Sequence, residues 1–258
     1  MEFETVEVSG EGPVRHLVLN RPEVHNAVNP QLIADVQEAC LALEADPSVR
    51  VIIVRGAGKS FCSGADLKAP RVSRTEAMLN SKRGARMADV LTHINPITIA
   101  ACHGYMIGGG VVIPACCDFR IGAPSIKATL NEVSIGFNLN WHTVPALIQL
   151  VGPARAKEML LFGRTYDADT LLRYGYLNEV VGEDELVEAA ERYAAGIVAQ
   201  PPVPVTVTKA SINAYSKALD RSVQHMDAIA SAFMSHSPNS RIAQQTYFSG
   251  EGRDWVEE

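Results

Sequence analysis

Hydrophobic and polar residues alternate with period two at the start of the chain. The segments "FETVEV" (3–8) and "VRHLVLN" (14–20) flank the turn signal "SGEGP" and therefore predict a β-hairpin. The apolar spacing then changes to three and four residues in "NPQLIADVQEACLALEAD" (29–46). This spacing predicts an α-helix with Asn29 as its N-cap and Pro30 at its first position.

The next segments alternate between strand and helix patterns. "VRVIIVRG" (49–56) is a short apolar run before a glycine, which is typical of a strand covered on both faces. A helical pattern around 74–94 and the strand patterns "ITIAAC" (97–102) and "FRIGA" (119–123) follow it. This alternation predicts an α/β fold.

The last third of the chain has a helical pattern. No strand is expected after "YLNEVV" (176–181), and residues 183–248 have helical spacing that only "QPPVP" (200–204) interrupts. The composition shift at Pro201 predicts a core over 1–200 and a helical C-terminal region over 201–258.

Composition and charge narrow the class of protein. Hydrophobic residues make up 47% of the 258, and no apolar stretch of membrane-spanning length is free of charge. The net charge of -6 argues against a nucleic-acid surface, and the acidic start "MEFETVEVSG" is not expected to be a targeting peptide. The five cysteines form no C-x-x-C pair, and Cys116 and Cys117 lie in an apolar run. We therefore expect buried free thiols, a reducing cytoplasm and no membrane partner.

A run of three glycines, Gly108 to Gly110, follows the strand "ITIAAC" and opens a predicted helix, "GGVVIPACCD" (109–118). Glycine lets another group approach the main chain closely, and free N–H groups at a helix start attract negative oxygen. The run therefore predicts an oxyanion site, and a tight packing turn is the alternative. Pro114 fits this helix if it lies in the first turn.

A second glycine-rich segment, "GAGKSFCSGADLK" (56–68), follows a buried strand. Its "GKS" is not a phosphate-binding loop, because that motif needs a glycine five positions before Gly58 and Ile53 stands there.

Together, "FCSGADLK" (61–68) and "HGYMIGGG" (103–110) resemble the enoyl-CoA hydratase/isomerase family, which has the crotonase fold. Further segments that support the resemblance are "LNRPEVHNAVN", "CDFRIGA", "VGPARAKEMLLFGR", "DADTLLRYGYLNEVV" and "PPVPVTVTKASI". The resemblance implies a spiral of ββα units, an acyl-CoA thioester substrate and no cofactor beyond the coenzyme A of the substrate. It also implies that the C-terminal helices build homotrimers, often paired into hexamers.

The resemblance also assigns the oxyanion donors. Carried over by position, the backbone N–H groups of Ala65 and Gly109 polarise the thioester carbonyl and stabilise an enolate, with Gly108 beside them. The loop residues that follow Ala65 shape the substrate site and its nucleotide end, although an ordinary loop role is the alternative; they are Asp66, Leu67 and Lys68.

One of the two glutamates of the family's hydratases is missing here. The first belongs three residues after the middle glycine, where this chain has Val112, and the second is present as Glu132 in "NEVSIG". Water addition needs one group to activate water and another to handle the α-carbon proton. A single carboxylate beside an oxyanion site is enough to move a proton between carbons, and relatives that shift double bonds use one at the position of Glu132.

The segment after Glu132 departs from the family pattern "PGxGGT" and is "FNLNWHTV" (137–144). Asn140 stands where some relatives have an acting aspartate, but an amide cannot abstract a proton. Trp141 and His142 are expected to form a wall of the substrate site, with His142 the second candidate for a base.

Other polar residues are weaker candidates. Cys102 and His103 could mimic a nucleophile–base pair, but side chains of adjacent residues rarely face each other. Three basic side chains could neutralise the phosphates of coenzyme A, and the alternative is that they are ordinary solvated charges. They are Arg21, Lys59 and Arg155. The C-terminal tail matches the family poorly, so adenine contacts from Lys217 or Phe248 are doubtful. No metal is expected, because the seven histidines form no ligand-spaced cluster.

These observations predict an acyl-CoA enzyme with Glu132 as its single acid/base, most specifically an enoyl-CoA isomerase. A hydratase that uses Glu132 alone or with His142 is the nearest alternative, and hydrolysis or retro-Claisen cleavage through His142 is a weaker one. A non-catalytic acyl-CoA binder is the alternative from another class of protein.

Overall fold

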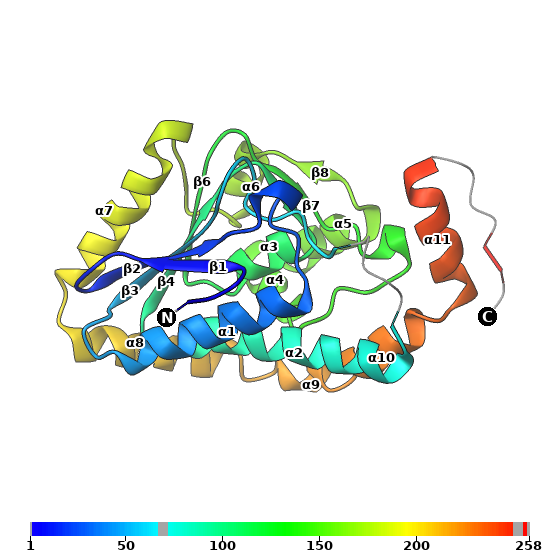
Figure 1. The fold of residues 1–258 in the computed structure, drawn as a ribbon, viewed down its shortest axis with the longest axis horizontal. Helices are drawn as coiled ribbons and strands as arrows, with labels where there is room; N and C mark the ends of the chain where they lie inside the picture. The colour runs from blue at the N-terminus through cyan, green and yellow to red at the C-terminus, as the bar shows by residue number, and fades with distance from the viewer. Residues whose placement is uncertain (1, 67–71, 250–254, 257–258) are drawn as a thin grey trace.

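The structure is a computed structural model that describes residues 2–66, 72–249 and 255–256. Its centre is a six-stranded sheet with strand order β1-β2-β3-β4-β6-β9 (Figure 1). β1 and β2 form the predicted antiparallel hairpin, and all later neighbours pair in parallel. The strands are β1 (Val6–Ser9), β2 (Val14–Leu19), β3 (Val51–Gly56), β4 (Ile97–Cys102), β6 (Phe119–Gly122) and β9 (Glu179–Val180).

Helices cover both faces of this sheet, as the apolar run of β3 predicts. Ile52 and Val54 of β3 pack into one core cluster with α1 (Pro30–Ala45) and α2 (Arg74–His93). The alternate residues of β3 pack into a second cluster with α7 (Leu186–Val198). Figure 1 shows α7 on one side of the strands and α1 and α2 on the other.

The N-terminus of α1 has the predicted cap. The Oδ1 of Asn29 accepts a hydrogen bond from the N–H of Leu32 at 2.8 Å, and Pro30 occupies the first helical position, where a missing N–H costs nothing.

A second, three-stranded sheet was not predicted. It consists of β5 (Tyr105–Ile107) paired in parallel with β7 (Lys127–Thr129), which pairs antiparallel with β8 (Thr165–Tyr166). Strands of two or three residues are too short to give a period-two pattern, so the sequence carries no signal for them.

The region from Glu183 to Ser249 is helical, as its spacing predicts. In Figure 1, α8 to α10 run along the side of α1 and α2, and α10 packs against α2. The remaining helices are α4 (Val144–Val151), α5 (Pro153–Phe162), α6 (Ala168–Tyr174), α8 (Pro202–Ser216), α9 (Arg221–Gln224), α10 (Asp227–Met234) and α11 (Pro238–Ser249). The short 3₁₀ helices are η1 (Pro22–Val24), η2 (Val133–Ile135) and η3 (Glu183–Glu185). The division at Pro201 into two parts stays a prediction.

The glycine run opens a short helix, α3 (Gly109–Ala115), as predicted, but Pro114 does not meet the condition under which it was expected to fit this helix. Pro114 is not in the first turn and lies one residue from the end. Because proline has no N–H, the helix lacks the hydrogen bond from residue 114 to the carbonyl of Gly110.

The five cysteines are all unpaired and buried, which confirms the prediction for Cys116 and Cys117. Burial raises the pKa of the Cys102 thiol to about 12 and that of Cys116 to about 11. Thiols with such pKa values are poor nucleophiles at neutral pH. Within the described part of the chain, no helix is both long enough and apolar enough to span a membrane.

Candidate active site

The two glycine-rich segments pair along their backbones. Cys62 and Met106 form an isolated parallel bridge, in which the N–H of Ile107 donates to the carbonyl of Cys62 at 3.0 Å. Side chains are excluded from this contact, since a Cβ on Gly64 would meet the carbonyl oxygen of Ile107 and one on Gly110 would meet that of Cys62. The glycines are thus needed for close approach of two backbones.

This pairing brings the two predicted oxyanion donors together. Ala65 lies three residues after Cys62, and Gly109 lies three residues after Met106, so both follow the bridge by the same offset. Val28 bonds to both neighbours of Ala65. Its N–H donates to the carbonyl of Gly64 at 2.7 Å, and its carbonyl accepts from the N–H of Asp66 at 3.0 Å. In a parallel ladder this pattern turns the N–H of Ala65 away from Val28.

Both donors lack a hydrogen-bond partner in the described part of the chain. Gly109 is the first residue of α3, where backbone N–H groups have no partner within the helix. Across the residues that the structure describes, neither the N–H of Ala65 nor that of Gly109 has a hydrogen-bond acceptor. Two such groups on adjacent segments can both donate to one developing oxyanion.

The carboxylate of Glu132 lies against the glycine run. Gly108 has φ +50° and ψ -111°, and its N–H donates to the carbonyl of Thr129 at 2.8 Å. A Cβ on Gly108 would lie 2.8 Å from the Oε1 of Glu132. Gly108 is therefore required for its backbone angles and for the room that it leaves for the carboxylate.

Burial changes the acidity of Glu132. Its Oε2 is buried and has no hydrogen-bond partner in the described structure. Loss of solvation raises the pKa of this carboxyl from 4.5 to about 7, and a backbone hydrogen bond within the residue opposes the shift. A carboxyl with a pKa near neutral can both take and return a proton.

Trp141 lies directly over the oxyanion glycine. A Cβ on Gly109 would be 3.3 Å from Cη2 and from Cζ3 of the indole, while the opposite edge of the indole packs on the Cα of Gly84 in α2. The indole therefore forms a wall beside Gly109. Val112, in the next turn of α3, is only 4% exposed and belongs to the same apolar core cluster.

The neighbours of Trp141 face the C-terminal helices. The Nδ2 of Asn140 donates to the Oγ of Ser231 in α10 at 3.3 Å, and the backbone N–H of His142 donates to the Oδ2 of Asp227 at 3.0 Å. His142 also lines a cavity of about 110 Å³ between α2 and α9. Of these three predicted site residues, the structure brings Trp141 into contact with Gly109 and bonds the other two to α10.

The predicted phosphate-binding residues have different surroundings. The Nη2 of Arg21 lies 3.8 Å from the Oδ2 of Asp66, so this arginine joins the two loops beside Ala65, and Lys59 is exposed. The Nη1 of Arg155 donates to the carbonyl of Tyr174 at 3.2 Å, and its guanidinium stacks on that ring, so it caps α6. Leu67 and Lys68 lie outside the described residues.

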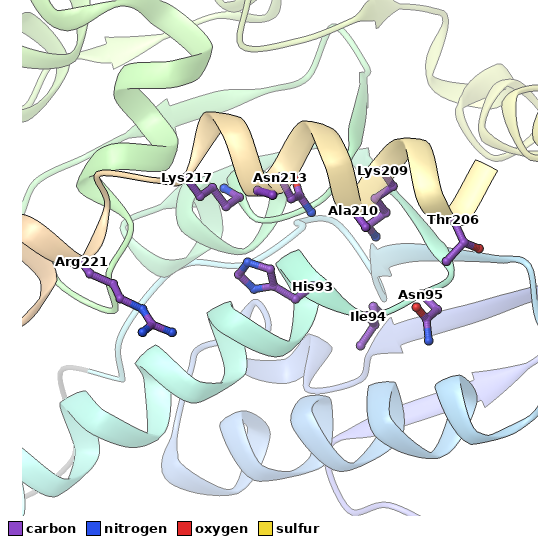
Figure 2. A pocket seen from close by; sticks show the side chains of 10 residues that line it. His93, Ile94, Asn95, Thr206, Lys209, Ala210, Asn213, Lys217 and Arg221 are labelled. Atoms are coloured by element: carbon purple, nitrogen blue, oxygen red, sulfur yellow. The ribbon is translucent and has the colours of Figure 1, made fainter. Parts of the chain in front are cut away.

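The weaker candidates do not meet at the site. Cys102 is fully buried, and the Nε2 of His103 bonds to the carbonyl oxygen of Gly58 at 3.2 Å. Lys217 lines the 110 Å³ cavity and a second one of about 310 Å³ between α8 and the end of α2, and no described residue of either glycine segment lines this second cavity (Figure 2). The side chain of Phe248 lies outside the described part.

Arg120 supports the site and was not singled out in the sequence. It is 3% exposed, and its guanidinium donates to the carbonyls of Cys117 at 2.7 Å and Pro114 at 3.3 Å. A cation at the C-terminal end of α3 complements the helix dipole and fixes the helix that presents Gly109. Its position in "CDFRIGA" was the available signal, because a charged residue inside an otherwise apolar strand needs partners.

In the described ranges, no three His, Cys, Asp or Glu side chains are grouped so that they could hold a metal ion.

Known proteins are similar to this chain over most of its length. The model of the enoyl-CoA hydratase/isomerase family matches residues 10–253. The chain is 32% identical over 215 residues to the crotonyl-CoA hydratase of Syntrophomonas wolfei, covering 83% of each. It is 31% identical over 222 residues to the peroxisomal Delta(3,5)-Delta(2,4)-dienoyl-CoA isomerase of Arabidopsis thaliana, covering 81% of this chain and 80% of that protein.

The fold agrees with the same assignment. The crystal structure of an enoyl-CoA hydratase from Mycobacterium avium subsp. paratuberculosis K-10 superposes with a TM-score of 0.89 at 21% identity, covering 99% of this chain and 100% of the other. The architecture is therefore the α/β crotonase fold. The chain belongs to the enoyl-CoA hydratase/isomerase family.

Proposed function

We propose that this protein acts on an acyl-CoA thioester, holds the enolate oxygen with the N–H groups of Ala65 and Gly109, and moves a proton with Glu132. The observation that carries the proposal is the position of the Glu132 carboxylate, buried, without a hydrogen-bond partner for Oε2 in the described structure, and against Gly108. A base beside a pair of free backbone donors is the combination that enolate chemistry needs.

The best specific reaction is isomerisation of an enoyl-CoA. The Glu132 carboxylate removes a proton from C2 of a 3-enoyl thioester, and the electron pair spreads over the double bond and the thioester oxygen. The two N–H groups stabilise this oxyanion. Glu132 then returns the proton to C4, which gives the 2-enoyl thioester with no net change in atoms.

The buried Val112 supports this choice. Hydration needs a second group to handle water, and an apolar side chain that is 4% exposed cannot supply it. The runner-up is a hydratase that uses Glu132 alone, which the likeness to a crotonyl-CoA hydratase favours. A non-catalytic binder would keep affinity for acyl-CoA and exchange no proton.

We also propose that the protein is a homotrimer or a pair of trimers. Large apolar side chains are exposed along α8 to α10, among them Val203 at 69%, Tyr215 at 89%, Leu219 at 80% and Phe233 at 71%. Exposed apolar surface of this extent is typical of a protein interface. Light scattering coupled to size-exclusion chromatography should give a molar mass of three or six times 27.9 kDa, and the mass of a monomer would refute the assembly.

Incubation with a panel of acyl-CoAs in deuterated water, followed by mass spectrometry, tests the function. Deuterium at the α- or γ-carbon with movement of the double bond supports the isomerase, and a gain of water supports the hydratase. A folded protein that binds acyl-CoA and leaves every member unchanged is a binder, and the catalytic proposal is then wrong.

A further inference from the structure

We propose that Trp141 determines acyl-chain specificity by closing the acyl end of the site against the 110 Å³ cavity that lies beyond its indole. With Trp141 in place, the site takes short acyl groups. When the indole is removed, the chain can extend into the cavity. This inference rests on the proposed function, because it assumes an acyl-CoA bound at Gly109.

The indole is held between two glycines. One edge of its six-membered ring lies against Gly109, and its five-membered ring occupies the space that a side chain on Gly84 would fill. A thioester oxygen bound to the N–H of Gly109 would place the acyl carbons next to this indole. Trp141 is therefore the first wall that a growing acyl chain would meet along α3.

The cavity continues the same gap between α2 and α3. Ala88 and Thr92 follow Gly84 at intervals of four residues, so they lie on the same face of α2, and both line the cavity. Cys116 lies two turns after Gly109 and lines it as well. Trp141 itself lines the cavity, and its indole lies against Gly109, so the same residue borders both the oxyanion glycine and an existing space.

The lining sets how far a chain could extend. The cavity lining includes small buried side chains, those of Ala88, Cys116 and Ala146. Its other lining residues include charged ones such as Lys217 and Asp220. A volume of 110 Å³ holds about three or four water-sized groups, so an opened site would accept only a few more carbons.

The backbone of Trp141 is held in a strained conformation by the C-terminal helices. Trp141 has φ +59° and His142 has φ +63°, angles that non-glycine residues rarely adopt. The N–H of His142 bonds to Asp227, and its carbonyl accepts from the Nε2 of Gln224 at 3.3 Å. These contacts hold the backbone at Trp141 and His142 in angles that the local sequence alone would not favour. They therefore fix the direction of the Trp141 side chain, as expected of a residue that forms a wall of the site.

Calorimetric binding of saturated acyl-CoAs from acetyl to decanoyl tests the inference without requiring turnover. For the wild type, affinity should stop rising at a short chain length. For Trp141→Ala, the rise should continue by about fourfold for each further buried methylene. Over about three methylenes, the preference for long over short chains should grow on the order of 50-fold. Trp255→Ala is the matched control, because that tryptophan is 55% exposed at the far C-terminus, and its profile should equal the wild type.

A second perturbation covers the case in which Trp141→Ala does not fold. Gly84→Ala adds a methyl group where the indole lies, and should therefore displace the indole and weaken short-chain binding in the wild type. In a Trp141→Phe background, with a smaller ring, the same change should have a smaller effect. Equal chain-length profiles for the wild type and a folded Trp141 variant would overturn the inference and leave the proposed function intact. A folded wild type that binds no acyl-CoA of any length would overturn both.

Discussion

The raised pKa of Glu132 makes a prediction about stability that does not depend on identifying the substrate. Glu132→Gln keeps the size of the side chain and removes its titration. At low pH the wild-type carboxyl is protonated and resembles the amide. As the pH rises, the wild type must either ionise a buried group or hold its proton, whereas the variant is unaffected.

The magnitude follows from the two pKa values. The folded chain holds the proton of Glu132 with a pKa of about 7, and the unfolded chain with its ordinary value of 4.5. Because the folded value is the higher one, the stabilisation is complete below the unfolded pKa and is lost as the pH rises through the folded pKa. Between pH 5 and pH 8, the free energy of unfolding of the wild type should fall by about 2.5 kcal/mol relative to Glu132→Gln.

Urea denaturation of both proteins at pH 5, 6, 7 and 8 measures this difference, with the protomer concentration held constant because assembly also contributes to stability. Glu38→Gln, an exposed glutamate on α1, controls for the loss of one negative charge, and its effect should not follow the same pH course. A difference between wild type and Glu132→Gln that is the same at every pH would show that the Glu132 carboxyl is well solvated, and the reasoning from its burial would be wrong.

Three further changes test the site. Gly109→Pro removes one oxyanion donor at a helix position that tolerates proline, so turnover should fall by about 10²–10³ while the circular dichroism is retained; wild-type turnover would move the oxyanion site elsewhere. Gly108→Ala should cost about 1–3 kcal/mol in urea denaturation, because of its φ of +50°, and should also displace the Glu132 carboxylate; an unchanged proton-exchange rate would argue against their contact. Val112→Glu should lower stability by about 3 kcal/mol and add weak hydration of a short 2-enoyl-CoA, seen by mass spectrometry. A stable Val112→Glu protein that adds no water would count against the assignment of that position.

Long elements with a clear period were predictable from the sequence. The hairpin at the start, α1 with its Asn29 cap, and the buried strand β3 each follow from a local pattern that tertiary packing then reinforces. The second sheet was not predictable, since β5, β7 and β8 exist only because distant segments pair across two or three residues. Whether Pro114 lies in the first turn of its helix was left open, because the start of a short helix after a glycine run has no periodic signal.

The site was predictable in part. The identities of Ala65, Gly109 and Glu132 came from motifs, and their equal offset from the bridge between Cys62 and Met106 needed the structure. A wall formed by Trp141 was expected, but its contact with Gly109 could not be inferred, because it depends on positive φ angles at two non-glycine residues and on bonds from α9 and α10 that are about 85 residues away. Likewise, the acidity of Glu132 depends on what buries it, and no local pattern records that.

The central claim is that Glu132 moves the α-proton of a bound acyl-CoA. The most direct measurement is the rate of α-proton exchange in deuterated water, followed by mass spectrometry for wild type and Glu132→Gln at saturating acyl-CoA, with binding measured on the same samples. The account predicts that Glu132→Gln binds acyl-CoA as the wild type does and exchanges the proton at least about 100-fold more slowly. Undiminished exchange in a folded Glu132→Gln protein would contradict the account and place the base elsewhere, with His142 the next residue to test.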